Sequence, residues 1–187
     1  GWLHLQGGSR LAPLDLSVPA DISSAAFWLV AASIVPGSRI SMANVGVNPS
    51  RTGILDVLDK MGADVHLEGI ENQGGEPRAK LVVSATTLQG IRIEGEDALR
   101  SIDEIPILAV AAAFAHGTTE FRDLAELRVK ESDRIRAMCR GLLALGFQVV
   151  EHSDGMTITG GKPQNHAVIH SGGDHRIAMA FAIAGLA

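Results

Sequence analysis

Aromatic residues are scarce in this chain, and tyrosine is absent. They make up 4% of the 187 residues, which is too few for a surface on which nucleic-acid bases would stack. Positive charge is not in excess either, because the formal net charge is −5, and this argues against a polyanionic partner. We therefore expect no nucleic-acid partner, and an anionic substrate would need a local cluster of basic side chains.

Long apolar runs are also missing. The longest, Ala25 to Val35 and Ile105 to Ala115, are shorter than the roughly 20 residues that a helix needs to cross a bilayer, so we expect no membrane association. No cationic leader with a cleavage site opens the sequence, which favours a cytoplasmic location. The single cysteine, Cys139, lies on an apolar helical stripe and is interpreted as a core residue in a reducing compartment rather than as a nucleophile.

Motifs for metals and cofactors are not apparent. His166 and His170 are four residues apart, but they fall on an apparent strand with no cysteine or acidic ligand nearby, so a metal site is not expected. Neither a Walker A motif nor a dinucleotide fingerprint occurs, and we expect no cofactor. What is present is 46% hydrophobic residues and 21 glycines, a composition that suits a soluble α/β protein.

The expected elements occur twice in the same order. Each unit has an apolar helix that begins at an aspartate, a glycine turn into a short strand, and a second helix that ends at a glycine before a hairpin. Placing Gly37 over Gly117 and Gly62 over Gly146 aligns two units of the type βαβαββ. The elements are a helix from Asp21, strand 39–42, helix 49–61, hairpin loop 72–77 and strand 80–84, then a helix from Asp103, strand 119–122, a helix from Ser132 to 145, hairpin tip 153–155 and strand 156–159.

The two ends of the chain fit into neither unit. Alternating residues predict strands at 2–6 and 14–18. At the other end a third unit begins at Asp174 and stops inside its first helix, which leaves an apolar surface at 177–186. We interpret the chain as a fragment of a longer one, and we expect this surface to favour self-association.

A strongly charged stretch, residues 126–136, carries four basic and three acidic side chains and leads into an apolar helical stripe. Lys130 lies four residues and Glu131 three residues before Arg134, so the three heads would converge around the first turn of a helix. Free backbone N–H groups at a helix start already favour an anion. The stretch therefore predicts an anion site that contains a carboxylate, and a solvated ladder of salt bridges is the alternative.

Two motifs carry a resemblance to a known family. Leu127 to Arg134, Leu-Arg-Val-Lys-Glu-Ser-Asp-Arg, resembles the Arg-Val-Lys-Glu-Ser/Thr-Asp-Arg motif of the EPSP synthase (5-enolpyruvylshikimate-3-phosphate synthase) family, and Asp174-His175-Arg176 resembles its Asp-His-Arg motif. The resemblance covers nearly the whole chain and implies an α/β protein with mixed sheets, built from repeated βαβαββ units of the enolpyruvate transferase (EPT/RTPC-like) fold. It implies that residues 1–18 are the end of a preceding domain and a hinge, and that 19–187 are an incomplete domain with units at about 19–90 and 91–163 and the start of a third at 164–187.

The resemblance also implies a reaction. Members of the family transfer the enolpyruvyl group of phosphoenolpyruvate to the 5-hydroxyl of shikimate 3-phosphate and release phosphate, a step of aromatic amino-acid biosynthesis. These two substrates would be the partners, glyphosate would be a candidate inhibitor, and no metal or redox cofactor would be needed. Asp103 would contact the ring hydroxyls and accept the 5-hydroxyl proton, Lys130 would lie beside that hydroxyl, and Glu131 would transfer a proton at the methylene carbon.

Three further residues match family contacts to phosphoenolpyruvate, namely Arg134, His175 and Arg176. If Asp103 faces a buried ammonium such as that of Lys130, it stays ionised and can accept a proton. We expect the helix starts near residues 103, 132 and 174 to share one surface, and Arg136 to point away from it.

Some positions depart from the family pattern or suit simpler roles. Glu126 stands where some members have asparagine in a substrate contact. Asp21 is expected to cap its helix, and Ser23 and Ser24 are taken as capping groups too, although the serine pair resembles a phosphate site of the other domain. The alternatives are an enzyme like UDP-N-acetylglucosamine enolpyruvyl transferase, which the two motifs disfavour, and a non-catalytic anion-binding half-site.

Overall fold

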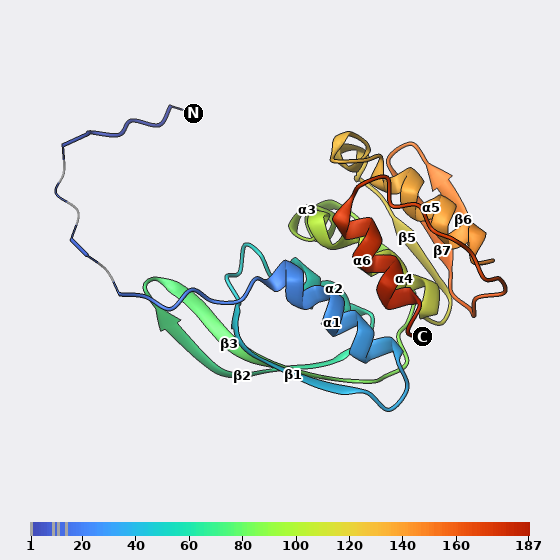
Figure 1. The fold of residues 1–187 in the computed structure, drawn as a ribbon, viewed down its shortest axis with the longest axis horizontal. Coiled ribbons are helices and arrows are strands. Elements are labelled where there is room, and N and C mark those ends of the chain that lie inside the picture. The colour runs from blue at the N-terminus through green and yellow to red at the C-terminus, as the bar shows by residue number, and fades with distance from the viewer. Residues whose placement is uncertain (1, 9, 11, 14) are drawn as a thin grey trace.

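The computed structural model describes residues 2–8, 10, 12–13 and 15–187. Residues 2–8 lie away from the rest of the chain, and no strand forms there (Figure 1). The strand expected at 2–6 is therefore wrong, because a strand needs a neighbour to pair with, and Trp2 and Leu3 are fully exposed. The strand expected at 14–18 includes Leu14, which lies outside the described residues, and residues 15–18 form no strand.

The core is built around three apolar helices. These are α1 (Ile22–Ile34), α4 (Ile105–Phe114) and α6 (His175–Ala184), and they pack against one another (Figure 1). Every residue of α4 up to Ala113 is buried, as expected for a helix that is apolar on all sides. Asp21 caps α1 by accepting the backbone N–H groups of Ser23 and Ser24 at 3.2 Å, which confirms its expected role.

The first unit also contains an antiparallel sheet. Its strands β1 (Arg39–Gly46), β2 (Asp64–Gln73) and β3 (Glu76–Ser84) have the order β1-β3-β2. Helix α2 (Gly53–Lys60) contacts β2, and α1 contacts β1 and β3. The helix expected over 49–61 is thus shorter, and residues 49–52 form a turn in front of it.

The second unit repeats this arrangement. Its sheet has the order β4-β5-β7-β6, with strands β4 (Arg92–Ile93), β5 (Thr118–Phe121), β6 (Gln148–His152) and β7 (Gly155–Thr159). Helix α5 (Arg134–Ala144) packs on β6 and β7, and α4 packs on β7. The short elements α3 (Gly95–Arg100), η1 (Ile102–Glu104) and η2 (Ala125–Val129), the last two being 3₁₀ turns, connect these parts.

The two units are equivalent in topology and in turn geometry. The last strand of each unit lies inside its sheet, β3 between β1 and β2, and β7 between β5 and β6. Gly37 and Gly117 have φ of 74° and 87°, and Gly62 and Gly146 have φ of 82° and 89°. Such angles favour glycine, so the alignment of these glycines, and with it the repeated α/β architecture, is confirmed.

The segment before α6 differs from the expectation. Residues 160–174 form no strand, so the strand expected under His166 and His170 is wrong. This segment finds no partner strand with which to form a ladder. Among the residues that the structure describes, no group of three or more potential metal-ligating side chains occurs. No helix in the described part of the chain is long and apolar enough to cross a membrane.

Cys139 lies on the buried face of α5. Burial raises the pKa of its thiol from 9.0 to about 12, so almost none of the reactive thiolate forms near neutral pH. Its interpretation as a core residue is confirmed.

Candidate functional site

The candidate site is organised around a buried guanidinium. Arg134 is the first residue of α5, and its side chain is 1% exposed. Its Nε donates to Oδ2 of Asp174 at 2.9 Å, and its Nη2 donates to Oε2 of Glu131 at 2.5 Å. Its Nη1 lies 3.7 Å from Oδ1 of Asp103. Three carboxylates from three parts of the chain thus surround one cation.

Asp174 is the buried partner in this cluster. It caps α6 by accepting the backbone N–H of Arg176 at 2.9 Å, and it accepts the hydroxyl of Ser132 at 3.0 Å. Burial raises the pKa of Asp174, but the hydrogen bonds from Arg134 and Ser132 more than offset this, and the pKa lies below its ordinary value. The ionised carboxylate therefore ties the start of α5 to the start of α6.

A second guanidinium stands on the other side of Asp103. Nη1 of Arg176 donates to the backbone carbonyl of Asp103 at 2.8 Å, and Nη2 lies 3.7 Å from Oδ2 of the same residue. The Asp103 side chain is 42% exposed and that of Glu131 is 55% exposed. These two carboxylates are reachable from solvent while their arginine partners are largely buried, an arrangement that suits proton transfer beside a bound anion.

The expected meeting of three helix starts is confirmed, with two corrections. Asp103, Glu131, Arg134 and Arg176 form one set of ion pairs. Lys130 instead pairs with Glu126, and among the described residues Lys130 makes no ion pair with Asp103. Residues 130–133 are not helical, so the spacing rule that brought Lys130 to Arg134 does not hold there.

The other helix starts can be placed as well. Asp103 does not cap α4, because it lies within the 3₁₀ turn η1 and makes no capping hydrogen bond. His175 is the first residue of α6 and is exposed. His175 and Arg176 therefore lie in the first turn of a helix, as the sequence indicated.

Sequence reasoning missed two members of this region. Asp174 was expected only to begin a helix, yet it is the fully buried partner of Arg134. Glu104 was not singled out, although a glutamate directly before an apolar helix was a signal, and it is buried. Ser23 donates its hydroxyl to Glu104 at 2.5 Å. The expectation that Ser23 and Ser24 cap α1 is therefore wrong: Asp21 is the cap, and the Ser24 hydroxyl donates to its Oδ2 at 3.3 Å.

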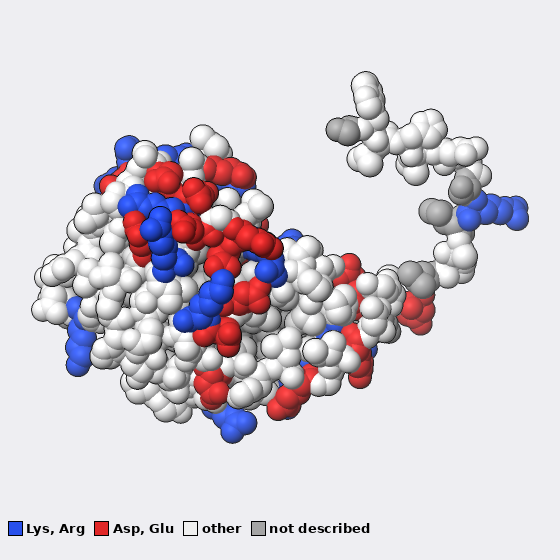
Figure 2. Space-filling view, turned by 180° about the vertical axis from the view of Figure 1, so that it is seen from behind, with Lys and Arg blue, Asp and Glu red and all other residues white. Residues whose placement is uncertain are grey.

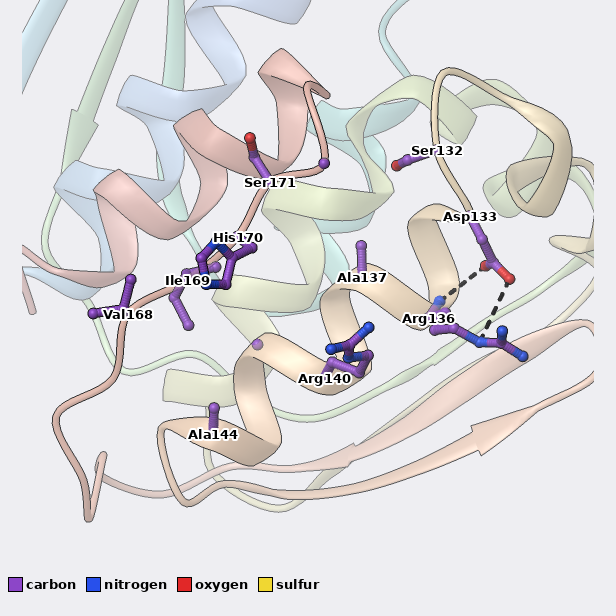
Figure 3. A pocket seen from close by; sticks show the side chains of 12 residues that line it. Ser132, Asp133, Arg136, Ala137, Arg140, Ala144, Val168, Ile169, His170 and Ser171 are labelled. Carbon is purple, nitrogen blue, oxygen red and sulfur yellow. Dashed lines mark hydrogen bonds and ion pairs between the residues drawn. The ribbon is translucent and has the colours of Figure 1, made fainter.

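Two cavities lie near these residues. One of about 170 Å³ borders Asp103 and Glu104 and the loop that carries Arg51. The other, of about 320 Å³, lies between α5 and residues 168–172 (Figure 3). Of the cluster around Arg134, it is bordered by Ser132 alone.

Arg136 belongs to the second cavity and not to the cluster. Figure 3 shows it beside Asp133, to which its backbone N–H donates at 3.0 Å. Its side chain is 63% exposed and lies 3.8–3.9 Å from Glu151 and Asp133. The expectation that Arg136 points away from Arg134 and its partners is confirmed.

Charges of both signs are interspersed on one face of the molecule. Figure 2 shows blue and red side chains side by side over the globular part rather than a uniformly basic surface. Arg134 and Arg176 likewise lie next to groups of opposite charge, because both pair with carboxylates. This face therefore presents no continuous basic patch of the kind that a polyanion would need.

The lowered pKa of Asp174 predicts acid sensitivity. A group with a depressed folded-state pKa stabilises the fold above its ordinary value of 3.8 and loses this contribution as the pH falls through the folded-state pKa. We expect the free energy of unfolding of Asp174→Asn to be well below that of the unsubstituted chain at pH 7, and the two to approach each other below about pH 4. Urea titrations from pH 7 to pH 3 measure both. Asp59→Asn, an exposed position, is the control, and a gap for Asp174→Asn that stays constant with pH contradicts this account.

The fold of this chain also occurs in a solved structure of low sequence identity. The enolpyruvyl transferase NikO from Streptomyces tendae has the same fold, with a TM-score of 0.57 at 18% identity over 90% of this chain and 37% of that one. Residues 2–187 match the model of the EPSP synthase (3-phosphoshikimate 1-carboxyvinyltransferase) family, and the chain belongs to that family.

Several relatives share more than the fold. The protein named 3-phosphoshikimate 1-carboxyvinyltransferase from Thermosynechococcus vestitus is 57% identical over 184 residues, which are 98% of this chain and 42% of the relative. Its namesake from Synechococcus sp. (strain JA-3-3Ab) is 55% identical over 97% of this chain and 41% of the relative. The EPSP synthase structure from Acinetobacter baumannii superimposes with a TM-score of 0.87 at 44% identity, covering 97% of this chain and 43% of that one. The chain thus spans about two-fifths of the length of these relatives.

Proposed function

We propose that this chain is part of an enzyme that transfers the enolpyruvyl group from phosphoenolpyruvate to the 5-hydroxyl of shikimate 3-phosphate and releases phosphate. The observation that carries the proposal is the cluster in which the buried Arg134 meets Asp103, Glu131 and Asp174. It supplies a cation for an acidic substrate and exposed carboxylates for proton transfer on one surface. The names of the relatives support the same reaction.

The proposed proton transfers belong to two carboxylates. Asp103 accepts the proton of the attacking 5-hydroxyl, and the guanidinium groups of Arg134 and Arg176 lie 3.7 Å from its carboxylate oxygens. Glu131 transfers a proton at the methylene carbon: the carbon gains a proton and becomes a methyl group in the tetrahedral intermediate, and it loses one again as phosphate leaves and the double bond re-forms. Lys130 lies beside the 5-hydroxyl in this proposal, and it must leave Glu126 to reach it.

The proposed anion contacts belong to the helix starts. Arg134 binds the carboxylate of phosphoenolpyruvate, and Arg176 and His175 bind the same substrate at the first turn of α6, where free backbone N–H groups add to the attraction. The substrate anion replaces carboxylates that now pair with the arginines. Neither a metal nor a redox cofactor takes part in this scheme.

The chain is proposed to form most of one domain of a two-domain enzyme. Residues 1–18 are the end of the preceding domain and the hinge, and 19–187 are an incomplete domain with units at about 19–90, 91–163 and 164–187. Shikimate 3-phosphate and phosphoenolpyruvate are the partners and glyphosate is a candidate inhibitor, with the reaction in the cytoplasm. The exposed apolar side chains Met179 and Leu186 favour self-association of this chain when it is alone.

A second candidate function is a non-catalytic half-site that binds small anions. The existing pairing of every site arginine with a carboxylate favours it, because each bound anion must displace an internal partner. Phosphate release by the full-length protein would support the enzyme, and its absence would support the non-catalytic half-site. An enzyme specific for UDP-N-acetylglucosamine is disfavoured by the two motifs and by the names of the relatives.

The test uses a full-length chimera, in which this chain replaces the matching residues of the Thermosynechococcus vestitus relative. We expect the chimera to release phosphate from phosphoenolpyruvate in the presence of shikimate 3-phosphate. Asp103→Asn should lower kcat by about 100-fold or more, the usual loss when a general base is removed. Asp59→Asn, which removes an exposed carboxylate of α2, should not change kcat. Full activity of the Asp103 variant would argue against the assigned base.

A further inference from the structure

Residues from all three units meet at one carboxylate that has no part in the proposed chemistry. Glu104 is the last residue of η1, and its side chain is 5% exposed. Its Oε1 accepts the hydroxyl of Ser23 at 2.5 Å and lies 3.8 Å from Nη1 of Arg176. Ser23 belongs to the first unit, Glu104 to the second and Arg176 to the third. The carboxylate therefore lies where the three repeats join.

The charges around Glu104 come from every element packed against it. Arg51, in the loop before α2, donates Nη2 to the Ser23 hydroxyl at 3.1 Å, and Arg176 approaches from α6. Burial raises the pKa of Glu104, and the neighbouring Asp103 acts in the same direction, whereas Ser23, Arg176 and Arg51 lower it. The Glu104 carboxylate, which is costly to bury, therefore faces the guanidinium of Arg176, which is proposed to bind the substrate.

Arg176 needs such a restraint. An arginine side chain has about 2 kcal/mol of rotamer entropy, and a ligand that binds one rotamer loses affinity in proportion to the population of the others. The restraints on this guanidinium are the backbone carbonyl of Asp103 at 2.8 Å and the two carboxylates of Asp103 and Glu104. Asp103 is proposed to take up a proton during the reaction, which weakens its hold. Glu104 is the buried restraint that remains.

We propose that Glu104 is a positioning residue: its carboxylate fixes the guanidinium of Arg176 and thereby sets the affinity for phosphoenolpyruvate. The inference rests on the proposed function, because it takes Arg176 to be a ligand of that substrate. Glu104 itself touches no reacting atom. Its effect therefore lies in the binding of phosphoenolpyruvate and not in the rate of the chemical step.

The test compares Glu104→Gln with the unsubstituted full-length chimera. Glutamine keeps the size of the side chain and an oxygen for Ser23 but removes the charge that faces Arg176. We expect Kd and KM for phosphoenolpyruvate to rise about tenfold, with kcat changed by less than about twofold. Titration calorimetry measures Kd, and the rate of phosphate release measures KM and kcat. Glu120→Gln is the matched control, because Glu120 also accepts from an arginine, Arg122 at 2.5 Å, but lies on β5 away from the cluster.

Two further readings separate positioning from a general structural role. In the Arg176→Ala background, Glu104→Gln should have no additional effect on Kd, whereas a structural role would add its loss in both backgrounds. The ratio of Kd between Glu104→Gln and the unsubstituted chimera should fall toward one as the pH falls through the raised pKa of Glu104, because the protonated glutamate resembles glutamine. An unchanged Kd in Glu104→Gln, or equal losses in both backgrounds, overturns the proposal.

Failure of the proposed function would look different. A chimera that binds phosphoenolpyruvate but releases no phosphate would argue against the proposed reaction. The comparison of Kd values would still test whether Glu104 positions Arg176. If Glu104→Gln does not fold, Ser23→Ala removes the hydroxyl that fixes the carboxylate and should raise Kd about threefold. An unchanged Kd there also overturns the proposal.

Discussion

Replacing Arg134 with alanine is expected to lower the free energy of unfolding by about 3–5 kcal/mol. The guanidinium is buried against Asp174, which is itself fully buried. The substitution leaves that carboxylate in the interior without its cation, and this costs more than the loss of an exposed pair. Urea denaturation of the chain with and without the substitution measures the difference.

Arg136→Ala is the matched control for this result. Arg136 lies two residues further along the same helix, and its side chain is mostly exposed and contacts carboxylates only at 3.8–3.9 Å. Its removal should change the free energy of unfolding by no more than about 0.5 kcal/mol. Similar losses for the two arginines would show that Arg134 is not held as the structure indicates.

The same pair of substitutions tests binding in the full-length chimera. Arg134→Ala should weaken phosphoenolpyruvate binding by about 2 kcal/mol or more, because a charge-assisted pair with the substrate carboxylate is lost. Arg136→Ala should leave KM for phosphoenolpyruvate unchanged. Equal effects on substrate saturation would contradict the role proposed for Arg134. Since the first variant is also destabilised, its folded fraction is measured in parallel.

Local chemistry explains why much of the fold could be predicted. Gly62 and Gly146 end their helices with positive φ, a conformation that only glycine adopts readily, so their spacing marks equivalent turns. Asp21 caps α1 because its carboxylate needs only backbone N–H groups two and three residues away. These features depend only on residues that are close in sequence, so they can be predicted from the sequence alone.

The candidate site was predictable only in part, because its pairings are tertiary. Arg134 and Asp174 are 40 residues apart, and nothing local determines which of several acidic residues reaches the guanidinium. Lys130 was expected beside Arg134 because the two are spaced as on a helix. The helix begins only at Arg134, so the spacing rule does not apply to Lys130. Glu104 could be read as an exposed residue until Ser23 and Arg176 were placed beside it.

Packing between helices was also hidden from the sequence. Gly141 lies inside α5, where glycine weakens a helix, and the reason for it comes from α6. A Cβ atom at this position would lie 2.1 Å from the ring of Phe181. The ring fills the space that a side chain would need, and five residues of α6, Phe181 among them, are buried. This contact explains why α6 is less exposed than expected.

The 187-residue chain alone is expected to fold but to release no phosphate above background. The buried faces of α1, α4, α5 and α6 form one continuous core, which is sufficient for an independent fold. The chemistry requires cations for two phosphates and a carboxylate, whereas Arg134 and Arg176 already pair with internal carboxylates and the net charge is −5. In the proposed two-domain enzyme the second domain forms the opposite wall of the active site, and its cations and its exclusion of water are needed for the reaction.

Circular dichroism and a cooperative urea transition would establish the fold of the isolated chain, and phosphate release would be followed with both substrates at millimolar concentration. The full-length chimera is the positive control, because it presents the same Arg134 cluster opposite a second wall. Background-level release by a folded chain beside an active chimera means that Asp103, Glu131 and Arg134 are insufficient without that wall. Turnover by the isolated chain close to that of the chimera would mean that the cluster alone performs the reaction, and the proposed division of the active site between two domains would be wrong.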